Sequence, residues 1–338
     1  MPSEAFKSAK NGPLISVIMP NFNKARYVGE SIGSLLAQNY QNWELLIVDD
    51  GSTDKSIPII RDFCNRDPRI KLFQRETLPK GGSACRNIAL ANSLGSYVIF
   101  LDSDDLLGEN SLAQRVEYVM QNPGLDFAVF NMVDFLTSVQ EQSNTFVVPV
   151  GDPLTLLLQH ELPWCVMQPI WQKKFLAKLQ YFDTSYPRFQ DVELHTRALL
   201  TPGVKYSVVR DAPPDCFHRT ADDRRSINHK EFITLTVQAG SKYIREMERT
   251  LLETEERGPG KVKHLNGTKI DLAKRVLHHK ISGKIDASTC QSLLLQIAEA
   301  GDTIGSGKPI IAATKAIHYF DFTRKPAVFR ALKKIFTQ

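Results

Sequence analysis

The chain has few cysteines and no long apolar run. Five cysteines occur in 338 residues, and no two of them form a CxxC pair. No apolar run approaches the roughly 20 residues that a membrane-spanning helix needs. The beginning of the sequence does not have the pattern of a secretory leader. An odd cysteine count without a leader predicts reduced thiols and a cytoplasmic protein.

Internal repeats, low-complexity tracts and a strong charge excess are also lacking. The net charge is +5, which is small for 338 residues and does not by itself indicate a nucleic-acid partner. The hydrophobic content of 42% and the charged content of 23% are ordinary for a globular protein. This length is enough to bury a sizeable core in one large or two moderate domains.

The first half of the chain alternates short apolar runs with helical patterns. The expected strands are residues 14–19, 44–48, 70–73, 97–101 and 127–130, and helical spacing of apolar residues lies between them. Asn23 is a candidate cap of the first helix. This rhythm predicts a parallel sheet covered by helices on both faces. No GxGxxG or GxxxxGK[ST] motif occurs, which argues against an ordinary dinucleotide-binding dehydrogenase or a P-loop enzyme.

The fourth apolar run ends in a cluster of carboxylates, Asp102-Ser103-Asp104-Asp105. Side chains two apart on a strand point the same way, so Asp102 and Asp104 are expected to face one point. Anions this close repel one another unless a cation lies among them. Oxygen ligands suit Mg²⁺ or Mn²⁺, and such ions suit a substrate that carries phosphates. The alternative is an acidic turn that caps the next helix.

Two further polar clusters follow expected strands, Pro20-Asn21-Phe22-Asn23 and Asp49-Asp50-Gly51-Ser52. Ligands of parallel sheets bind outside the carboxyl ends of the strands. Three polar loops at one edge are a stronger indication of a binding site than any one of them.

The wording and spacing of these segments resemble a known family. The carrying segments are ISVIMPNFNKARYVGESIGSLLAQNYQNWELLIVDDGSTD, GGSACRNIALANSLGSYVIFLDSDD and FQDVELHTRAL. Over residues 14 to about 220 the chain is similar to family-2 inverting glycosyltransferases with the GT-A fold. The resemblance implies sugar transfer from a nucleoside diphosphate sugar, usually with a divalent metal.

The resemblance also assigns roles to the polar clusters. Pro20, Asn21 and Asn23 would line the nucleoside pocket. Asp50, or else Asp49, would accept a hydrogen bond from the imide N–H of uracil or thymine, and the other aspartate would serve its loop. Arg86 would contact the base or a phosphate. Asp104 would ligate Mn²⁺ or Mg²⁺, with Asp102 or Ser103 near the ribose and Asp102 as a further metal ligand.

The third segment would supply the general base. Asp191 matches the family's catalytic carboxylate, although the family usually has Glu-Asp where this chain has Gln190-Asp191. Glu193 stays open as a rival base or as a surface residue, and Asp191 itself as a helix cap. His218 is a candidate third metal ligand, and Arg219, Arg224 or Arg225 would clamp the diphosphate.

The acceptor side and the C-terminal third are less informative. Trp164 is the preferred aromatic for stacking on a sugar, with a core position as the alternative. Residues 253–269 are rich in charge, glycine and proline, which indicates a loop, and further helices follow. The tail from Phe322 to Phe336 resembles a basic amphipathic helix, which would lie on a membrane surface or dock on the protein.

Together these observations predict a catalytic GT-A domain over residues 13–225 and a helical region over residues 226–338. The expected function is inverting, metal-dependent transfer from a UDP-sugar to a glycan or lipid-linked glycan acceptor. No nucleic-acid partner is expected, and the location is the cytoplasm, with peripheral contact at the inner face of the membrane through the basic tail. The alternative is a non-catalytic nucleotide-sugar-binding protein with the same fold.

Overall fold

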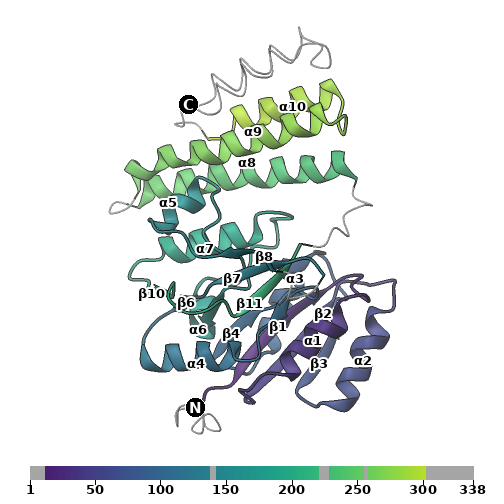
Figure 1. Ribbon diagram of the computed structural model, residues 1–338. Coiled ribbons are helices and arrows are strands. Elements are labelled where there is room, and N and C mark those ends of the chain that lie inside the picture. Colours follow the sequence, from purple (N-terminus) through teal and green to yellow (C-terminus); the bar gives the residue numbers. More distant parts are fainter. Residues whose placement is uncertain (1–11, 138–141, 221–227, 255–257, 302–338) are drawn as a thin grey trace. The chain divides into compact units, whose positions relative to one another are not determined.

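The computed structural model describes residues 12–137, 142–220, 228–254 and 258–301 (Figure 1). Contacts group the chain into two compact units. The first, here called the sheet unit, comprises Met1–Val150, Pro163–Ser185 and Thr201–Asp222. The second, the helical unit, comprises Gly151–Leu162, Tyr186–Leu200 and Asp223–Gln338. Each unit is therefore assembled from segments that are far apart in the sequence.

A seven-stranded, mostly parallel sheet forms the centre of the sheet unit, as predicted. Its order is β10-β6-β9-β4-β1-β2-β3. The strands are β1 (Ile15–Asn21), β2 (Trp43–Asp49), β3 (Ile70–Gln74), β4 (Tyr97–Phe100), β6 (Phe127–Val129), β9 (Pro169–Gln172) and β10 (Tyr206–Val208). Only β9 runs antiparallel, to both β4 and β6. The alternation of strands and helices predicted the parallel strands, whereas β9 is inserted from later in the chain.

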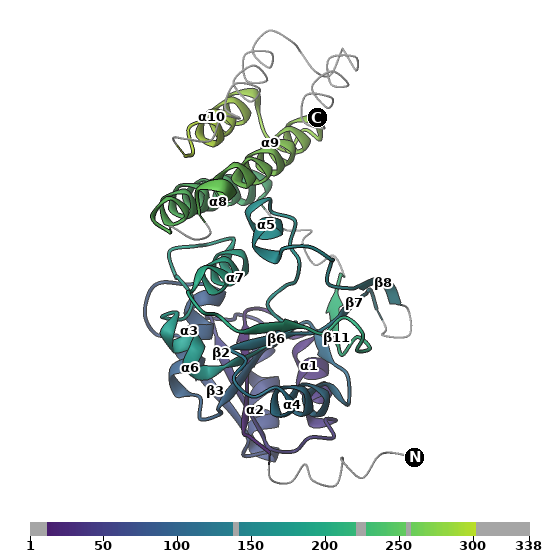
Figure 2. The same cartoon turned by 90° about the vertical axis from the view of Figure 1, so that its left-hand side faces the viewer.

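Helices cover both faces of this sheet, because its central strands are apolar on both sides. All residues of β2 are buried, which is typical of a strand between two helical layers. The helices α1 (Val28–Leu36), α2 (Ser56–Arg66) and α4 (Ser111–Gln121) pack on one face in a common apolar core. On the other face lie α3 (Gly82–Asn92) and α6 (Lys173–Lys178) (Figure 2).

A second, four-stranded sheet lies next to the acidic cluster in the chain. Its order is β5-β11-β7-β8, with β5 (Leu106–Leu107), β7 (Met132–Phe135), β8 (Gln142–Phe146) and β11 (Cys216–Arg219). β5 follows the acidic cluster directly and pairs antiparallel with β11. The sequence analysis did not predict this sheet, because its strands are short and come from three distant segments.

The helical unit combines two early helices with the C-terminal helices. They are α5 (Pro153–Leu158), α7 (Gln190–Leu200), α8 (His229–Glu253), the 3₁₀ helix η3 (Pro259–His264), α9 (Leu265–Ile281) and α10 (Ala287–Ala298). α8, α9 and α10 pack on one another, and α5 packs on α7. The expected loop over residues 253–269 is wrong in its second half, because Leu265 is fully buried and begins α9.

None of the described helices is long and apolar enough to span a membrane. The basic tail and Arg224 and Arg225 lie outside the described residues, so the membrane-contact prediction that rests on the tail stays a prediction.

Candidate active site

The three polar loops predicted from the sequence follow strands that end at one edge of the main sheet. β1 lies between β2 and β4 and runs parallel to both. Asn21 is opposite Asp49 in the register, and Ile18 is opposite Phe100. The polar residues after each strand therefore leave the sheet in the same direction, which is the position where ligands of such sheets bind.

Asp49 serves its own loop, which was the role left open for one of the two aspartates. The side chain is fully buried. Its carboxylate accepts hydrogen bonds from Asn21 Nδ2 (2.7 Å), Gly51 N (3.0 Å) and Ser52 N (2.8 Å). Ser52 Oγ donates a further bond to Asp49 Oδ1 (2.5 Å). With these donors the carboxylate of Asp49 holds the β2–α2 loop against the end of β1.

Asn23 is not a helix cap, so that prediction is wrong. α1 begins at Val28, with Tyr27 before it. Asn23 has φ 51°, a left-handed conformation that Asn tolerates better than most residues. Its amide oxygen accepts hydrogen bonds from the backbone N–H groups of Thr53 (2.8 Å) and Asp54 (3.3 Å). The side chain thus ties the β1–α1 loop to the β2–α2 loop.

Asp50 is fixed by a basic neighbour that the sequence analysis did not single out. Arg75, just after β3, donates from Nε to Asp50 Oδ1. The other carboxylate oxygen accepts a bond from Gly81 N (2.9 Å). Gly81 has φ 110°, which only glycine adopts readily. The sequence held one signal for this contact. Arg75 directly follows β3, the parallel neighbour of β2, and parallel neighbours end at the same edge of a sheet.

Asp102 and Asp104 of the acidic cluster each pair with a cationic side chain. Arg86 Nη2 on α3 lies 2.5 Å from Asp102 Oδ1, and Lys24 Nζ lies 2.6 Å from Asp104 Oδ2. Both carboxylates remain partly exposed, at 38% and 28% of the side-chain surface. Ser103 between them is buried. The expected repulsion between the carboxylates is therefore relieved by one cation for each.

Asp105 and Arg219 hold the acidic cluster through hydrogen bonds to each other and to its backbone. Burial raises the pKa of Asp105 well above its ordinary value, and the charges of Asp102 and Asp104 raise it further. Asp105 Oδ1 accepts a bond from the backbone N–H of Arg219 (2.9 Å). Arg219 Nε in turn donates to the carbonyl oxygen of Asp104 (2.8 Å).

The guanidinium of Arg219 is almost fully enclosed. It bonds Glu30 at 2.6 Å, and its side chain is 4% exposed. The rings of Tyr27 and Phe135 lie 4.6 and 4.5 Å from it. These contacts make Arg219 a support of the acidic loop, and they do not fit the diphosphate clamp expected for it.

His218, the candidate third metal ligand, is paired with a carboxylate of the second sheet. It lies on β11, and its Nδ1 is 3.0 Å from Asp134 Oδ1 on β7. Among the residues that the structure describes, no group of three or more His, Cys, Asp or Glu side chains is arranged to hold a metal ion. The structure therefore does not bring His218 into one ligand group with Asp102 and Asp104.

The predicted base, Asp191, lies in the first turn of α7 in the helical unit, inside the helix rather than at a cap position. Its Oδ1 accepts a bond from the N–H of Val192 (3.0 Å). Glu193, the rival base, is buried and makes a two-point ion pair with Arg197, at 2.6 and 2.7 Å. The surface role left open for Glu193 is therefore wrong.

His195, one turn after Asp191, is fully buried. Burial lowers the pKa of His195 to about 4, against an opposing effect of the Asp191 charge. His195 is thus neutral near pH 7, so it adds no positive charge beside Asp191.

Trp164 is a core residue, so the sugar-stacking prediction is wrong. It is 1% exposed and packs near Phe127, with ring centroids 6.3 Å apart. Its place after Pro163 suggested a loop, but its large apolar area is buried in the sheet unit.

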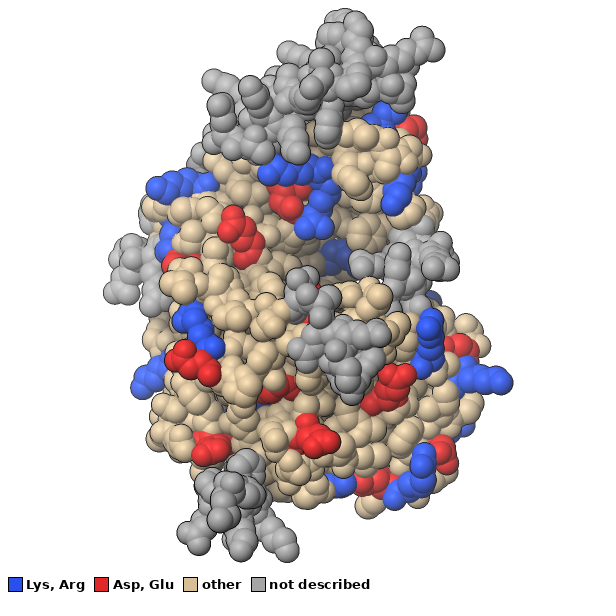
Figure 3. All heavy atoms as spheres, in the orientation of Figure 1, with Lys and Arg blue, Asp and Glu red and all other residues tan. Residues whose placement is uncertain are grey.

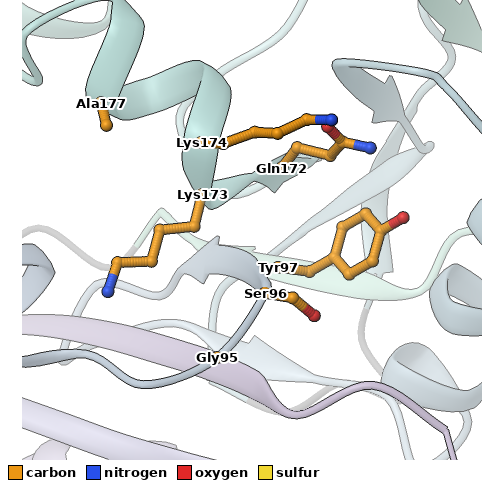
Figure 4. Close-up of a pocket in the computed structure, with 7 residues that line it drawn as sticks. All are labelled: Gly95, Ser96, Tyr97, Gln172, Lys173, Lys174 and Ala177. Carbon is orange, nitrogen blue, oxygen red and sulfur yellow. The ribbon is translucent and has the colours of Figure 1, made fainter.

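A pocket of the sheet unit lies at the other end of β4. It has a volume of about 440 Å³ and is lined by Gly95, Ser96, Tyr97, Gln172, Lys173, Lys174 and Ala177 (Figure 4). Tyr97 begins β4, whereas the acidic cluster follows its last residue. The pocket is thus separate from the predicted site.

Acidic and basic side chains are interspersed over the face shown in Figure 3.

Part of the chain is similar to known glycosyltransferases. Residues 16–161 match the family model "Glycosyl transferase family 2". A curated relative from Escherichia coli, the UDP-Glc:alpha-D-GlcNAc-diphosphoundecaprenol beta-1,3-glucosyltransferase WfgD, is 40% identical over 109 residues. That alignment covers 32% of this chain and 42% of WfgD. The chain spans less than half the length of the curated relatives it matches.

Two solved structures share the fold. Staphylococcus aureus TarS 1–349 in complex with UDP-GlcNAc gives a TM-score of 0.60 at 19% identity, covering 90% of this chain and 86% of TarS. The mannosyltransferase PcManGT from Pyrobaculum calidifontis, in complex with GDP-Man and Mn²⁺, gives a TM-score of 0.54 at 19% identity, covering 97% and 86%. Residues 16–161 thus match glycosyltransferase family 2, and the chain shares the GT-A fold with these solved structures.

Proposed function

We propose that this protein transfers a sugar from a UDP-sugar to a hydroxyl group of a glycan or lipid-linked glycan, with inversion at the anomeric carbon and with Mn²⁺ or Mg²⁺. The observation that carries the proposal is the set of loops at one edge of the main sheet. One loop presents a fixed aspartate, Asp50, and another presents Asp102 and Asp104 beside cationic side chains.

Asp50 supports a pyrimidine with an imide N–H. Its carboxylate is held by Arg75 and by Gly81 N, so the group has a fixed orientation at low exposure. A carboxylate accepts the N–H of uracil or thymine, whereas cytosine has no such donor. The names of WfgD and of the TarS complex also contain UDP-sugars, which supports this choice of donor.

The residues of the acidic loop fit a divalent ion that is shared with phosphates. Asp102 and Asp104 offer only oxygen ligands, and they are partly exposed. Mg²⁺ is usually held by one or two carboxylates together with substrate phosphates, so a third protein ligand is not required. When bound, the ion supplies positive charge to the diphosphate leaving group. Lys24 and Arg86 add fixed positive charge at the same loop.

Asp191 is the proposed general base. In a single displacement, the acceptor oxygen bonds the anomeric carbon as the bond from that carbon to the diphosphate breaks. The electron pair leaves with UDP, and the proton of the hydroxyl passes to the carboxylate of Asp191. One base suffices, and no carboxylate nucleophile is needed. Glu193 is engaged by Arg197, which leaves Asp191 as the better candidate.

The test is transfer by the full chain, from UDP-glucose, UDP-GlcNAc or GDP-mannose, to a diphosphoundecaprenol-linked GlcNAc with and without Mn²⁺. NMR of the product reports the anomeric configuration. Asp191→Asn should keep UDP affinity, while the transfer rate falls by roughly 10²–10⁴. Asp62→Asn, which changes an exposed aspartate of α2, serves as the matched control.

Three results would contradict parts of the proposal. Normal turnover of the Asp191→Asn variant would exclude this residue as the base. Loss of UDP binding in that variant would make it a nucleotide or structural residue. Nucleotide-sugar binding without turnover on any acceptor would favour the alternative of a non-catalytic binding protein.

A further inference from the structure

The residue before the helix of the predicted base has an unusual conformation. Phe189 has φ 63°, a left-handed value that bulky residues rarely adopt. Its carbonyl oxygen accepts the N–H of Glu193 (2.8 Å), so it takes part in the first turn of α7. Asp191 follows two residues later. The orientation of the first turn of α7, which carries Asp191, therefore depends on how Phe189 is held.

An aromatic stack holds the ring of Phe189, and a hydrogen bond to an aspartate of α9 holds the stacking residue. The imidazole of His160 lies on it with ring centroids 4.4 Å apart and an angle of 10° between the planes. His160 follows α5, and its side chain is only 8% exposed. Its Nδ1 lies 2.8 Å from Asp271 Oδ2 on α9. Arg275 also donates to Asp271 Oδ2 (2.6 Å), and these contacts lower the pKa of Asp271 against the effect of burial.

Helix α8 also packs against the ring of Phe189. An added Cβ at Gly240 would lie 3.1 Å from Phe189 Cζ and 2.6 Å from Leu272 Cδ1, so the ring and the helix backbone approach closely. The ring of Tyr243 lies 5.7 Å from that of Phe189, and its hydroxyl is 2.7 Å from Thr196 Oγ1 on α7.

The residues just before Phe189 are tied to the same helix. The Tyr186 hydroxyl donates to Glu246 (2.6 Å), and the guanidinium of Arg188 lies 4.3 Å from the ring of Phe232. The segment that leads into α7 is thus fixed along much of α8.

We propose that His160 is a positioning residue for Asp191, acting through its stack on Phe189 and its bond to Asp271. This inference rests on the proposed function, because it assigns to α8 and α9 the task of orienting the base. All of its contacts lie within the helical unit. A misplacement of about 1 Å can cost about 10²-fold in rate, so a mobile first turn would slow transfer without affecting nucleotide binding.

The experiment compares His160→Ala and His160→Phe in the full chain, each alone and combined with Asp191→Asn. His160→Ala should lower kcat roughly 10- to 100-fold, with unchanged UDP affinity and an unchanged far-UV spectrum. His160→Phe keeps an aromatic ring on Phe189 but loses the bond to Asp271, so it should recover only part of the lost rate. His264→Ala is the matched control, because His264 lies 3.2 Å from the neighbouring Gln159 side chain and belongs to the same unit.

The double variants separate positioning from general damage. If His160 acts through Asp191, His160→Ala should cost little further rate once Asp191 is Asn. Rate losses that multiply would overturn the proposal, as would a kcat of His160→Ala equal to that of the control. If His160→Ala does not fold, Asp271→Asn takes its place in the same cycle, and an unchanged kcat or multiplying losses there would overturn it. Failure of the proposed function itself is distinct, because it appears as normal turnover of Asp191→Asn alone.

Discussion

Single side chains at the carboxyl edge of the main sheet have matched partners of opposite charge. Asp50 pairs with Arg75, Asp102 with Arg86, and Asp104 with Lys24. A carboxylate that already has a cationic neighbour binds a metal ion less strongly, because the ion must compete with that neighbour. Replacing one of these cationic side chains should therefore change how strongly its own carboxylate binds a divalent ion.

Lys24→Met should strengthen the binding of Mn²⁺ to the nucleotide-free protein. Removing the ammonium 2.6 Å from Asp104 leaves that carboxylate available to the ion. We expect a rise in affinity of roughly tenfold, which corresponds to about 1.4 kcal/mol. Titration followed by electron paramagnetic resonance measures free Mn²⁺ directly. Lys55→Met, at an exposed lysine before α2, is the control, and equal affinities in both variants would contradict the assignment of Asp104 as a ligand.

Asp50→Ala should weaken UDP binding by about 1–3 kcal/mol, because the imide N–H loses its acceptor in a partly dry site. Asp50→Asn should keep part of the affinity, since its amide oxygen can accept the same bond without the charge. Competition among UDP, TDP, GDP and CDP, followed by calorimetry, checks the choice of base. Tightest binding of GDP by the parent protein would contradict the uracil assignment, while leaving sugar transfer in place.

The candidate site residues could be placed from the sequence better than the side chains that hold them. Asp50, Asp102 and Asp104 stand in short motifs directly after apolar strands, so the sequence placed them at the edge where they are found. Lys24 and Arg75 reach their partners from other loops and Arg219 from the end of β11, and nothing in their local pattern specifies the partner. Trp164 shows the same limit, because a tryptophan after proline has the same local pattern in a loop and in a core.

Among the helices, α7 combines a partly exposed carboxylate with a fully buried histidine one turn later. The neutral His195 must take up a proton on unfolding when the pH is below 6.5, because burial lowers its pKa to about 4 in the folded protein. The unfolded state then binds more protons, so the free energy of unfolding falls as the pH falls from 6.5 towards 4.

This linkage predicts a loss of about 2 kcal/mol of stability from His195 alone between pH 7.5 and pH 5. His195→Leu should show a correspondingly smaller loss over the same range. Urea unfolding at the two pH values measures the difference. An equal pH dependence in the variant and the parent would show that His195 is protonated in the folded state.

The second sheet depends on a buried ion pair between α4 and the segment that begins β11. Arg115 is fully buried and bonds both oxygens of Asp215 at 2.7 Å, while its Nη1 donates to the carbonyl of Met167 (3.0 Å). Asp215 precedes Cys216, and β11 carries Arg219 at its other end. The pair therefore fixes the start of the strand that supports the acidic loop.

Arg115→Met should destabilise the protein by about 3–5 kcal/mol, because it leaves the buried carboxylate of Asp215 without a partner. Replacing both residues, as in Arg115→Met with Asp215→Leu, should recover much of the loss, since no charge then stays buried alone. Urea unfolding, analysed with one denaturant dependence (m-value) for all variants, gives the free energies of unfolding to compare. A double variant as unstable as the single one would mean that shape, rather than the unpaired charge, determines the cost.

For the whole molecule, the alternation of strands and helices was sufficient to predict the parallel strands of the main sheet and the edge at which the candidate site residues lie. It was not sufficient for the pairing of distant segments. β9 and β11 enter their sheets from far along the chain, and α5 and α7 pack with helices that follow residue 223. Periodicity reports which face of an element is apolar, but it does not report which other element covers that face.

All five cysteines are free, in agreement with the thiols expected from their spacing. Burial raises the pKa of Cys85 to about 12 and that of Cys290 to about 11. At pH 8 these two thiols should resist alkylation until the protein unfolds, because the thiolate is the reactive form. Mass spectrometry after labelling in buffer and in urea counts the modified sites, and rapid labelling of Cys85 in buffer would contradict its burial.

The order of segments in the two units has a consequence for synthesis on the ribosome. The chain enters the helical unit at residue 151, leaves it, returns at 186, leaves again and comes back for good at 223. At a typical rate of about 5–20 residues per second, α5 and α7 emerge several seconds before α8 and α9 are complete. During that time α5 and α7 can pack on each other, but η3 and α9, which also contact α5 in the finished unit, are still missing. The nascent chain therefore offers a chaperone two short apolar helices at a stage when the main sheet is already nearly complete.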